Sequence, residues 1–215
     1  MAKKTKNKIK HENKTKSKIL NISKKENKPK PENKTKLQKQ IKLSAIFGII
    51  TLIFAFPLGG FELLKFTKQM TSGFMVMYIL VYLLFFLFTA LFVRGFIITG
   101  RELKIPLLIK ASFIMIFASA LATVFQIILL FAPQITTILS IISLVIISGA
   151  ATLLFGIALL KLKKKFGSLA TAAGVLEIIG GAASITVILA LGAILLAIPA
   201  MIIEIILLFV IAKKL

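Results

Sequence analysis

The sequence predicts an all-α fold, a polytopic membrane bundle of six transmembrane helices preceded by a disordered basic N-terminal tail. The chain has 215 residues, and 58% of them are hydrophobic. After residue 42 the apolar residues gather in long runs, and a bilayer core needs ~20 such residues for each helical crossing. Most of the net charge of +21 lies before these apolar runs, because residues 1–42 hold 16 of the 26 lysines.

The first 42 residues form a low-complexity segment. The sequence Glu-Asn-Lys-Thr-Lys occurs at 12–16 and again at 32–36. Dense like charge with few apolar side chains does not offset the entropy lost on ordering a chain. We therefore expect two parts, a disordered cytosolic tail at 1–42 and a transmembrane domain at 43–215.

Four apolar runs follow the tail, and each is expected to form one helix. They are Leu43–Leu64, Gly73–Val93, Ala111–Phe131 and Ile135–Leu160. Small or hydroxyl side chains recur at helical spacing in two of them, at Ser44, Gly48, Thr51 and Ala55 and at Ser148, Thr152 and Gly156. Small residues at this period allow membrane helices to approach closely.

The last apolar stretch, residues 168–212, is long enough for two crossings and brings the count to six. It carries only two charges, Glu177 and Glu204. We expect a tight turn at Ala190/Leu191, with Gly192 as the turn residue. The two glutamates would then lie equally far from the turn and share a depth in the membrane.

The two glutamates also fall on stripes of small residues. These stripes are Ala170, Gly174, Glu177, Gly181 and Ser184 in the first helix and Ala193, Ala197, Ala200 and Glu204 in the second. Both carboxyls are therefore predicted to point into protein rather than lipid. Intramembrane acids are costly and are default functional candidates, so Glu177 and Glu204 are the candidate ion- or proton-binding residues.

Two interpretations of this pair stay open. The carboxyls could share a proton that is exchanged for a cation, and Pro199 could free the Leu195 carbonyl as a kink or an oxygen ligand. Alternatively, both are protonated and only hydrogen-bond neighbouring helices. The accessory polar candidates for such bonds are Ser119, Thr123 and Gln126. Lys110 is expected to extend to the interface, although it could instead pair with a glutamate.

Charge placement predicts the topology. With both termini cytosolic, ten basic residues outside the tail lie on the inner side, and only Lys65 and Lys68 lie on the outer side. This is the asymmetry that the positive-inside rule describes. The predicted location is the cytoplasmic membrane.

The residue inventory argues against an enzyme. The chain has no Asp, Cys or Trp, and its single histidine, His11, lies in the tail. Neither a catalytic triad nor a zinc site can be assembled in the membrane body. We expect no catalytic residues, no metal and no cofactor.

The expected partners are the lipid bilayer and, through the basic tail, anionic headgroups or an acidic protein. Nucleic acid is the runner-up for the tail, but the absence of interleaved aromatic residues and of arginine argues against it. Self-association into a homo-oligomer stays open.

The C-terminal quarter carries a resemblance. A short basic loop precedes Ala-Gly-Val-Leu-x-Ile-Ile-Gly-Gly at 173–181, and Gly-Ala-Ile-Leu-Leu-Ala-Ile follows at 192–198. This segment resembles small, uncharacterised multi-pass membrane proteins that are largely archaeal. The resemblance implies a membrane protein without an assigned activity and transfers no functional residue.

The sequence therefore favours an integral membrane protein that acts as a non-enzymatic scaffold or accessory protein, with its tail on anionic lipid or an acidic partner. The alternative is a small proton- or cation-coupled transporter or channel that uses Glu177 and Glu204.

Overall fold

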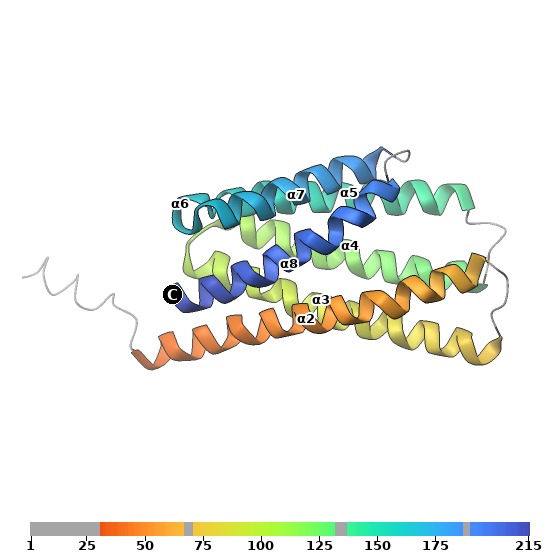
Figure 1. The fold of residues 1–215 in the computed structure, drawn as a ribbon, viewed down its shortest axis with the longest axis horizontal. Helices are drawn as coiled ribbons and strands as arrows, with labels where there is room; N and C mark the ends of the chain where they lie inside the picture. Colours follow the sequence, from red (N-terminus) through yellow and green to blue (C-terminus); the bar gives the residue numbers. More distant parts are fainter. Residues whose placement is uncertain (1–30, 67–70, 132–136, 187–189) are drawn as a thin grey trace, which may run out of the picture. The chain divides into compact units, whose positions relative to one another are not determined.

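The computed structural model describes residues 31–66, 71–131, 137–186 and 190–215, and residues 37–215 form one compact unit. Within the described ranges the chain forms seven helices and no strand (Figure 1). The helices are α2 (Pro31–Phe66), α3 (Ser72–Glu102), α4 (Pro106–Phe131), α5 (Thr137–Leu160), α6 (Lys163–Phe166), α7 (Ser168–Ile185) and α8 (Ala190–Lys214). The predicted all-α fold is confirmed for this part of the chain.

Five of these helices are long and apolar enough to cross a membrane, namely α2, α3, α4, α7 and α8. α5 has 24 residues, of which Ile146–Leu160 count as a shorter apolar helix. The structure thus supports an integral membrane protein, while the count of six spans stays a prediction.

Residues 31–42, predicted to belong to the disordered tail, are helical in the structure, while the boundary of the membrane domain at residue 43 stays a prediction. α2 begins at Pro31 rather than near Leu43. Proline is favoured in the first turn of a helix, because its missing N–H would have no helical partner there. The remainder of the predicted disordered tail, residues 1–30, lies outside the described residues.

α5 and α7 pack backbone against backbone. A Cβ added to Gly181 would lie 2.7 Å from the carbonyl oxygen of Gly149, and one added to Gly174 would lie 2.8 Å from that of Gly156. Both pairs are seven residues apart on their helices, so the antiparallel contact repeats after two turns. The small residues predicted to permit close approach on α7 do so against α5.

The predicted small stripe of α2 also lies at a close contact. A Cβ on Gly48 would lie 2.6 Å from the Phe92 ring of α3 and 2.8 Å from Ile205 of α8. Ser44 and Thr51 are buried on the same face. α2 therefore packs against α3 and α8 through its small residues.

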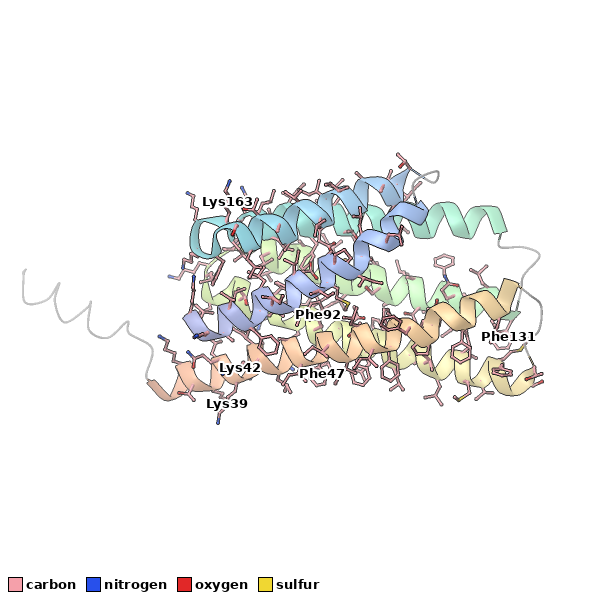
Figure 2. The ribbon with its side chains drawn as sticks, viewed as in Figure 1. Lys39, Lys42, Phe47, Phe92, Phe131 and Lys163 are labelled. Carbon is pink, nitrogen blue, oxygen red and sulfur yellow. The ribbon has the colours of Figure 1, made fainter. Side chains whose placement is uncertain are left out.

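One end of the compact unit is basic, and we call it the basic end. Its exposed cations come from the cytosolic ends predicted for the helices: Lys39, Lys42, Arg101, Lys104, Lys161, Lys163, Lys164, Lys165, Lys213 and Lys214. Figure 2 labels three of them, Lys39, Lys42 and Lys163, at the end opposite Phe131. We call the end at which α4 and α7 finish the distal end.

The buried core lies in the basic half of the unit. Its members come from the parts of the helices nearest the basic end: Ile41, Ala45, Phe92, Val93, Phe96, Leu108, Ala111, Phe155, Ala158, Leu159, Leu162, Phe166, Ala170, Ala173, Ile205, Leu207, Leu208, Ile211 and Ala212. Large apolar side chains are exposed towards the distal end, including Phe56, Phe131 and Leu195. Lipid tails are the natural solvent for such a surface.

The α5–α7 contact yields a test with a matched neighbour. The variant Gly181→Ala should lower the stability by ~1–3 kcal/mol, because its methyl group would overlap the backbone of α5. A Cβ on Gly180 meets nothing within 4 Å, so Gly180→Ala should be neutral or gain up to ~1 kcal/mol of helix propensity. Thermal unfolding in detergent measures both. Equal losses in the two variants would contradict the assigned contact.

Candidate functional site: a buried carboxyl pair

Glu177 lies at the middle of the 18-residue helix α7. It is one turn from Gly174 and one turn from Gly181, the two residues in backbone contact with α5. Its own Cβ lies 2.8 Å from the position that a Cβ on Gly156 would take. Only 9% of the residue is exposed, so the close approach of α5 encloses the base of the side chain.

Glu204 lies on α8 and is 4% exposed. Its neighbours in the chain, Ile205, Leu207 and Leu208, belong to the buried core. The Glu204 and Glu177 carboxyls lie close enough to share a hydrogen bond when one of them carries a proton. The Glu204 Oε1 atom is buried and has no other hydrogen-bond partner.

The two carboxyls meet as the small-residue stripes led us to expect, but the predicted turn is wrong. α7 ends at Ile185 and α8 begins at Ala190, so Gly192 lies inside a helix. Glu177 is then ~12 Å from the end of its helix, while Glu204 is ~21 Å from the start of its own, at 1.5 Å per residue. α8 runs obliquely across the bundle in Figure 1. Because α8 is inclined, the longer stretch of α8 before Glu204 and the shorter stretch of α7 after Glu177 bring the two glutamates to the same depth.

Pro199 does not supply a ligand to the pair. Proline lacks an N–H, so the Leu195 carbonyl has no helical partner. However, Pro199 is exposed and Leu195 is 76% exposed. The freed carbonyl therefore belongs to the outer face of α8, away from the buried carboxyls.

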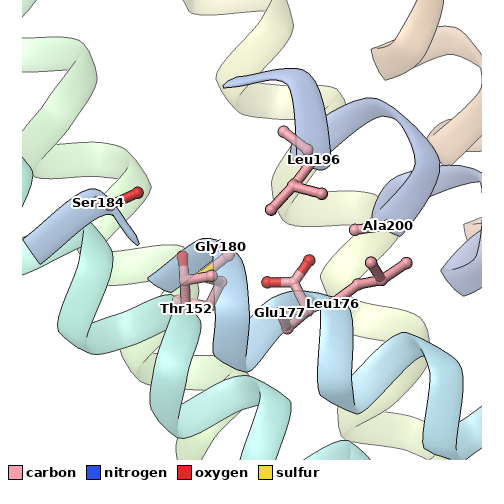
Figure 3. A pocket seen from close by; sticks show the side chains of 9 residues that line it. Thr152, Leu176, Glu177, Gly180, Ser184, Leu196 and Ala200 are labelled. Carbon is pink, nitrogen blue, oxygen red and sulfur yellow. The ribbon is translucent and has the colours of Figure 1, made fainter. Parts of the chain in front are cut away.

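A cavity of ≈ 160 Å³ adjoins Glu177 (Figure 3). Its lining comes from four helices: Met115 of α4, Thr152 of α5, Leu176, Glu177, Gly180 and Ser184 of α7, and Leu196, Ala197 and Ala200 of α8. Figure 3 shows the Glu177 carboxyl directed into the space between α7 and α8, with the Thr152 and Ser184 hydroxyls on the same side of α7. A polar cavity of this volume has room for water molecules.

The predicted accessory residues Ser119, Thr123 and Gln126 form hydrogen bonds with groups other than the two glutamates. Ser119 donates a hydrogen bond to the Met115 carbonyl at 2.9 Å, and Thr123 donates one to the Ser119 carbonyl at 2.9 Å. Both bonds follow the axis of their own helix and satisfy these hydroxyls without the glutamates. Gln126 accepts a bond from the Tyr78 hydroxyl at 3.4 Å.

Lys110 is exposed near the start of α4, as expected for a side chain that extends to the interface. Glu177 and Glu204 are buried, and Lys110 forms no ion pair with either of them. The exposed position of Lys110 gives no support to the alternative in which it neutralises the pair.

Two polar residues, Ser184 and Ser112, were not singled out as site residues from the sequence. Ser184 belongs to the predicted small stripe, but only the cavity assigns it a role beyond packing. Ser112 of α4 is fully buried, and its Oγ has no hydrogen-bond partner. Nothing in the local sequence distinguishes Ser112 from the other small residues of α4.

The side chains available as ligands limit which ion the site can bind. Within the described ranges, no group of three His, Cys, Asp or Glu side chains comes together. Two carboxyls with nearby hydroxyls match a proton or a single monovalent cation, whereas divalent Ca²⁺ prefers six to eight oxygen ligands.

No protein-family model, curated protein or solved structure matches this chain. The resemblance of residues 156–209 to archaeal membrane proteins accordingly stays an expectation.

The pairing of the two carboxyls can be tested through stability. Glu204→Leu should cost ~1–3 kcal/mol, because it leaves the Glu177 carboxyl buried without its partner. The double variant Glu177→Leu/Glu204→Leu should be more stable than the sum of the single losses predicts, since no orphaned acid remains. Thermal unfolding of the two single variants and the double variant gives the coupling. Strictly additive losses would contradict the pairing.

Proposed function

We propose that this protein is a small, non-enzymatic membrane carrier that exchanges protons for a monovalent cation at the Glu177–Glu204 pair. One observation supports the proposal above all. Two buried carboxyls lie within hydrogen-bonding reach of each other beside a cavity, and Glu204 Oε1 has no other hydrogen-bond partner.

A purely structural role explains this arrangement poorly. Placing an acid at the centre of a membrane helix costs ~2.5–3.5 kcal/mol on insertion scales. A hydrogen bond between membrane helices stabilises the folded protein by only ~0.6 kcal/mol on average. The balance favours a pair that is retained for its chemistry rather than for stability.

The exchange of one proton for one monovalent cation leaves the net charge of the carboxyl pair unchanged. With one shared proton the two carboxyls carry a net charge of −1. When a monovalent cation binds between them, that proton leaves to water, and the net charge of the site stays at −1. Because burial penalises a change of net charge, one-for-one exchange is the chemistry that this site supports best.

The carrier proposal includes a topology. α5 is the sixth span, and the basic end faces the cytosol, with both termini on that side in the cytoplasmic membrane. The excess of cations at the basic end supports this orientation. The lysine-rich residues before α2 belong to the cytosolic side in this proposed topology.

Reconstitution into liposomes tests the carrier. An imposed sodium or potassium gradient should drive proton movement in the opposite direction, read by a trapped pH-sensitive dye. Glu177→Gln and Glu204→Gln should each abolish this movement, because an amide cannot release the exchanged proton. Glu102→Gln is the matched control, since Glu102 is exposed at the end of α3, and it should transport like the parent.

The same assay separates the carrier from a scaffold. Absence of ion-driven proton movement by the folded parent protein would overturn the carrier proposal. Unchanged movement in the Gln variants would remove the carboxyl pair from the mechanism.

A second function, contact with anionic lipid, is favoured by the exposed lysines of the basic end. Each lysine near an anionic surface contributes ~1 kcal/mol. The triple variant Lys163→Gln/Lys164→Gln/Lys165→Gln should retain less anionic phospholipid through purification, as measured by mass spectrometry. High salt should remove the difference, because it screens exposed charges. Equal retention at low salt would count against this surface.

A further inference from the structure

The cavity lies on one side of the carboxyl pair. On α7 its lining extends from Glu177 through Gly180 to Ser184, towards the distal end. On α8 it runs from Leu196 to Ala200, which precede Glu204 and also lie towards the distal end. Both helices thus place the open space between the pair and the distal end.

The other side of the pair is closely packed. One turn from Glu177 towards the basic end, Ala173 is fully buried, as is Ala170 one turn further on. Leu207 and Leu208 of α8 and Leu159 of α5 are also fully buried there. A pocket of ≈ 140 Å³ in the basic half lies between α2 and α3, lined by residues that include Gln40, Ser44 and Arg94, and none of its lining residues belongs to α5, α7 or α8. Next to the pair, the closely packed apolar side chains of α5, α7 and α8 exclude water and therefore ions.

The polar groups differ in accessibility on the two sides of the pair. Thr152 and Ser184 present hydroxyls to the cavity (Figure 3). On the basic side the core cluster consists of Ala, Leu, Ile, Val and Phe side chains, and the polar side chains Ser44, Thr99 and Ser112 are buried. A hydrated ion therefore meets hydroxyls and then a carboxylate from one direction, and a buried, mainly apolar core from the other.

We propose that the cavity lined by Thr152, Glu177 and Ser184 is the access route of the exchanged ion, open only from the distal side of the membrane. This inference rests on the proposed carrier function. The structure then corresponds to the outward-facing state of the carrier, with the basic half as its closed barrier.

Cysteine accessibility tests the route directly, because the natural chain contains no cysteine. Ser184→Cys and Ala197→Cys would place single thiols on the cavity wall. A membrane-impermeant, positively charged methanethiosulfonate applied to intact spheroplasts should add one adduct to each variant. Applied to inside-out vesicles, it should add none. Mass spectrometry of the purified protein reads the adduct.

Two positions on α7, the helix that carries Ser184, serve as controls. Ser168 is exposed at the basic end of α7, so Ser168→Cys should be labelled only in inside-out vesicles. Ala173 is fully buried, so Ala173→Cys should resist labelling from both sides. Labelling of all four variants after denaturation verifies that each thiol is present and reactive.

Several outcomes would overturn the inference. Labelling of Ser184→Cys from the cytosolic side, or of Ala173→Cys from that side in the folded protein, would show that the barrier is not closed. Absence of labelling at both cavity positions from the distal side would show that no aqueous route exists there.

The cysteine labelling and the transport assay test different statements, so either can give a negative result without the other. One-sided labelling without ion-driven proton movement would retain the cavity and reject the carrier. Transport with labelling from both sides would retain the carrier and reject a route closed at the basic half.

Discussion

The backbone contact between α5 and α7 is the constraint on which the rest of the site depends. At Gly149, Gly156, Gly174 and Gly181 a single added methyl group would overlap the opposing backbone. Glu177 lies between two of these contacts, so its Cα is held by the closest approach in the bundle. A carboxyl that must be enclosed in a membrane needs such a fixed surround, because lipid offers it no hydrogen-bond partner.

The second organising feature is the uneven distribution of packing. The basic half carries a continuous apolar core, whereas the pair lies at the limit of that core and the cavity lies beyond it. Without a hydrophobic driving force between helices in lipid, close packing has to come from matched surfaces. Gly48 and Gly95 provide such surfaces for Phe92 and Leu208 in the basic half.

The sequence predicted the class of fold, the small-residue contacts and the meeting of the two glutamates. Each of these depends on periodicity within one helix, which a single sequence displays directly. The turn was misplaced at Ala190/Leu191 because residues 168–212 are apolar throughout, and Gly192 resembles a turn residue only out of context. Helix α2 was started too late, because lysine-rich composition obscured a segment that continues the helix.

The cavity could not be predicted, since it depends on the inclination of α8 relative to α7 and on one side chain from α4. Met115 and Leu196 have no sequence signal that separates them from other apolar residues. The bonds of the accessory candidates could not be predicted for a related reason. Ser119 and Thr123 donate their hydroxyl protons to carbonyls of their own helix, an option that spacing alone does not reveal.

The contrast between Gly181 and Gly180 has a consequence for how the bundle can rearrange. Gly181 is pressed against α5, while the adjacent Gly180 borders open space. α7 therefore has one face in backbone contact with α5 and another that borders the cavity beside α8. In the proposed carrier, a rearrangement that exposes the carboxyls to the opposite compartment would keep the α5–α7 pair intact and move α8, which carries Glu204, relative to it.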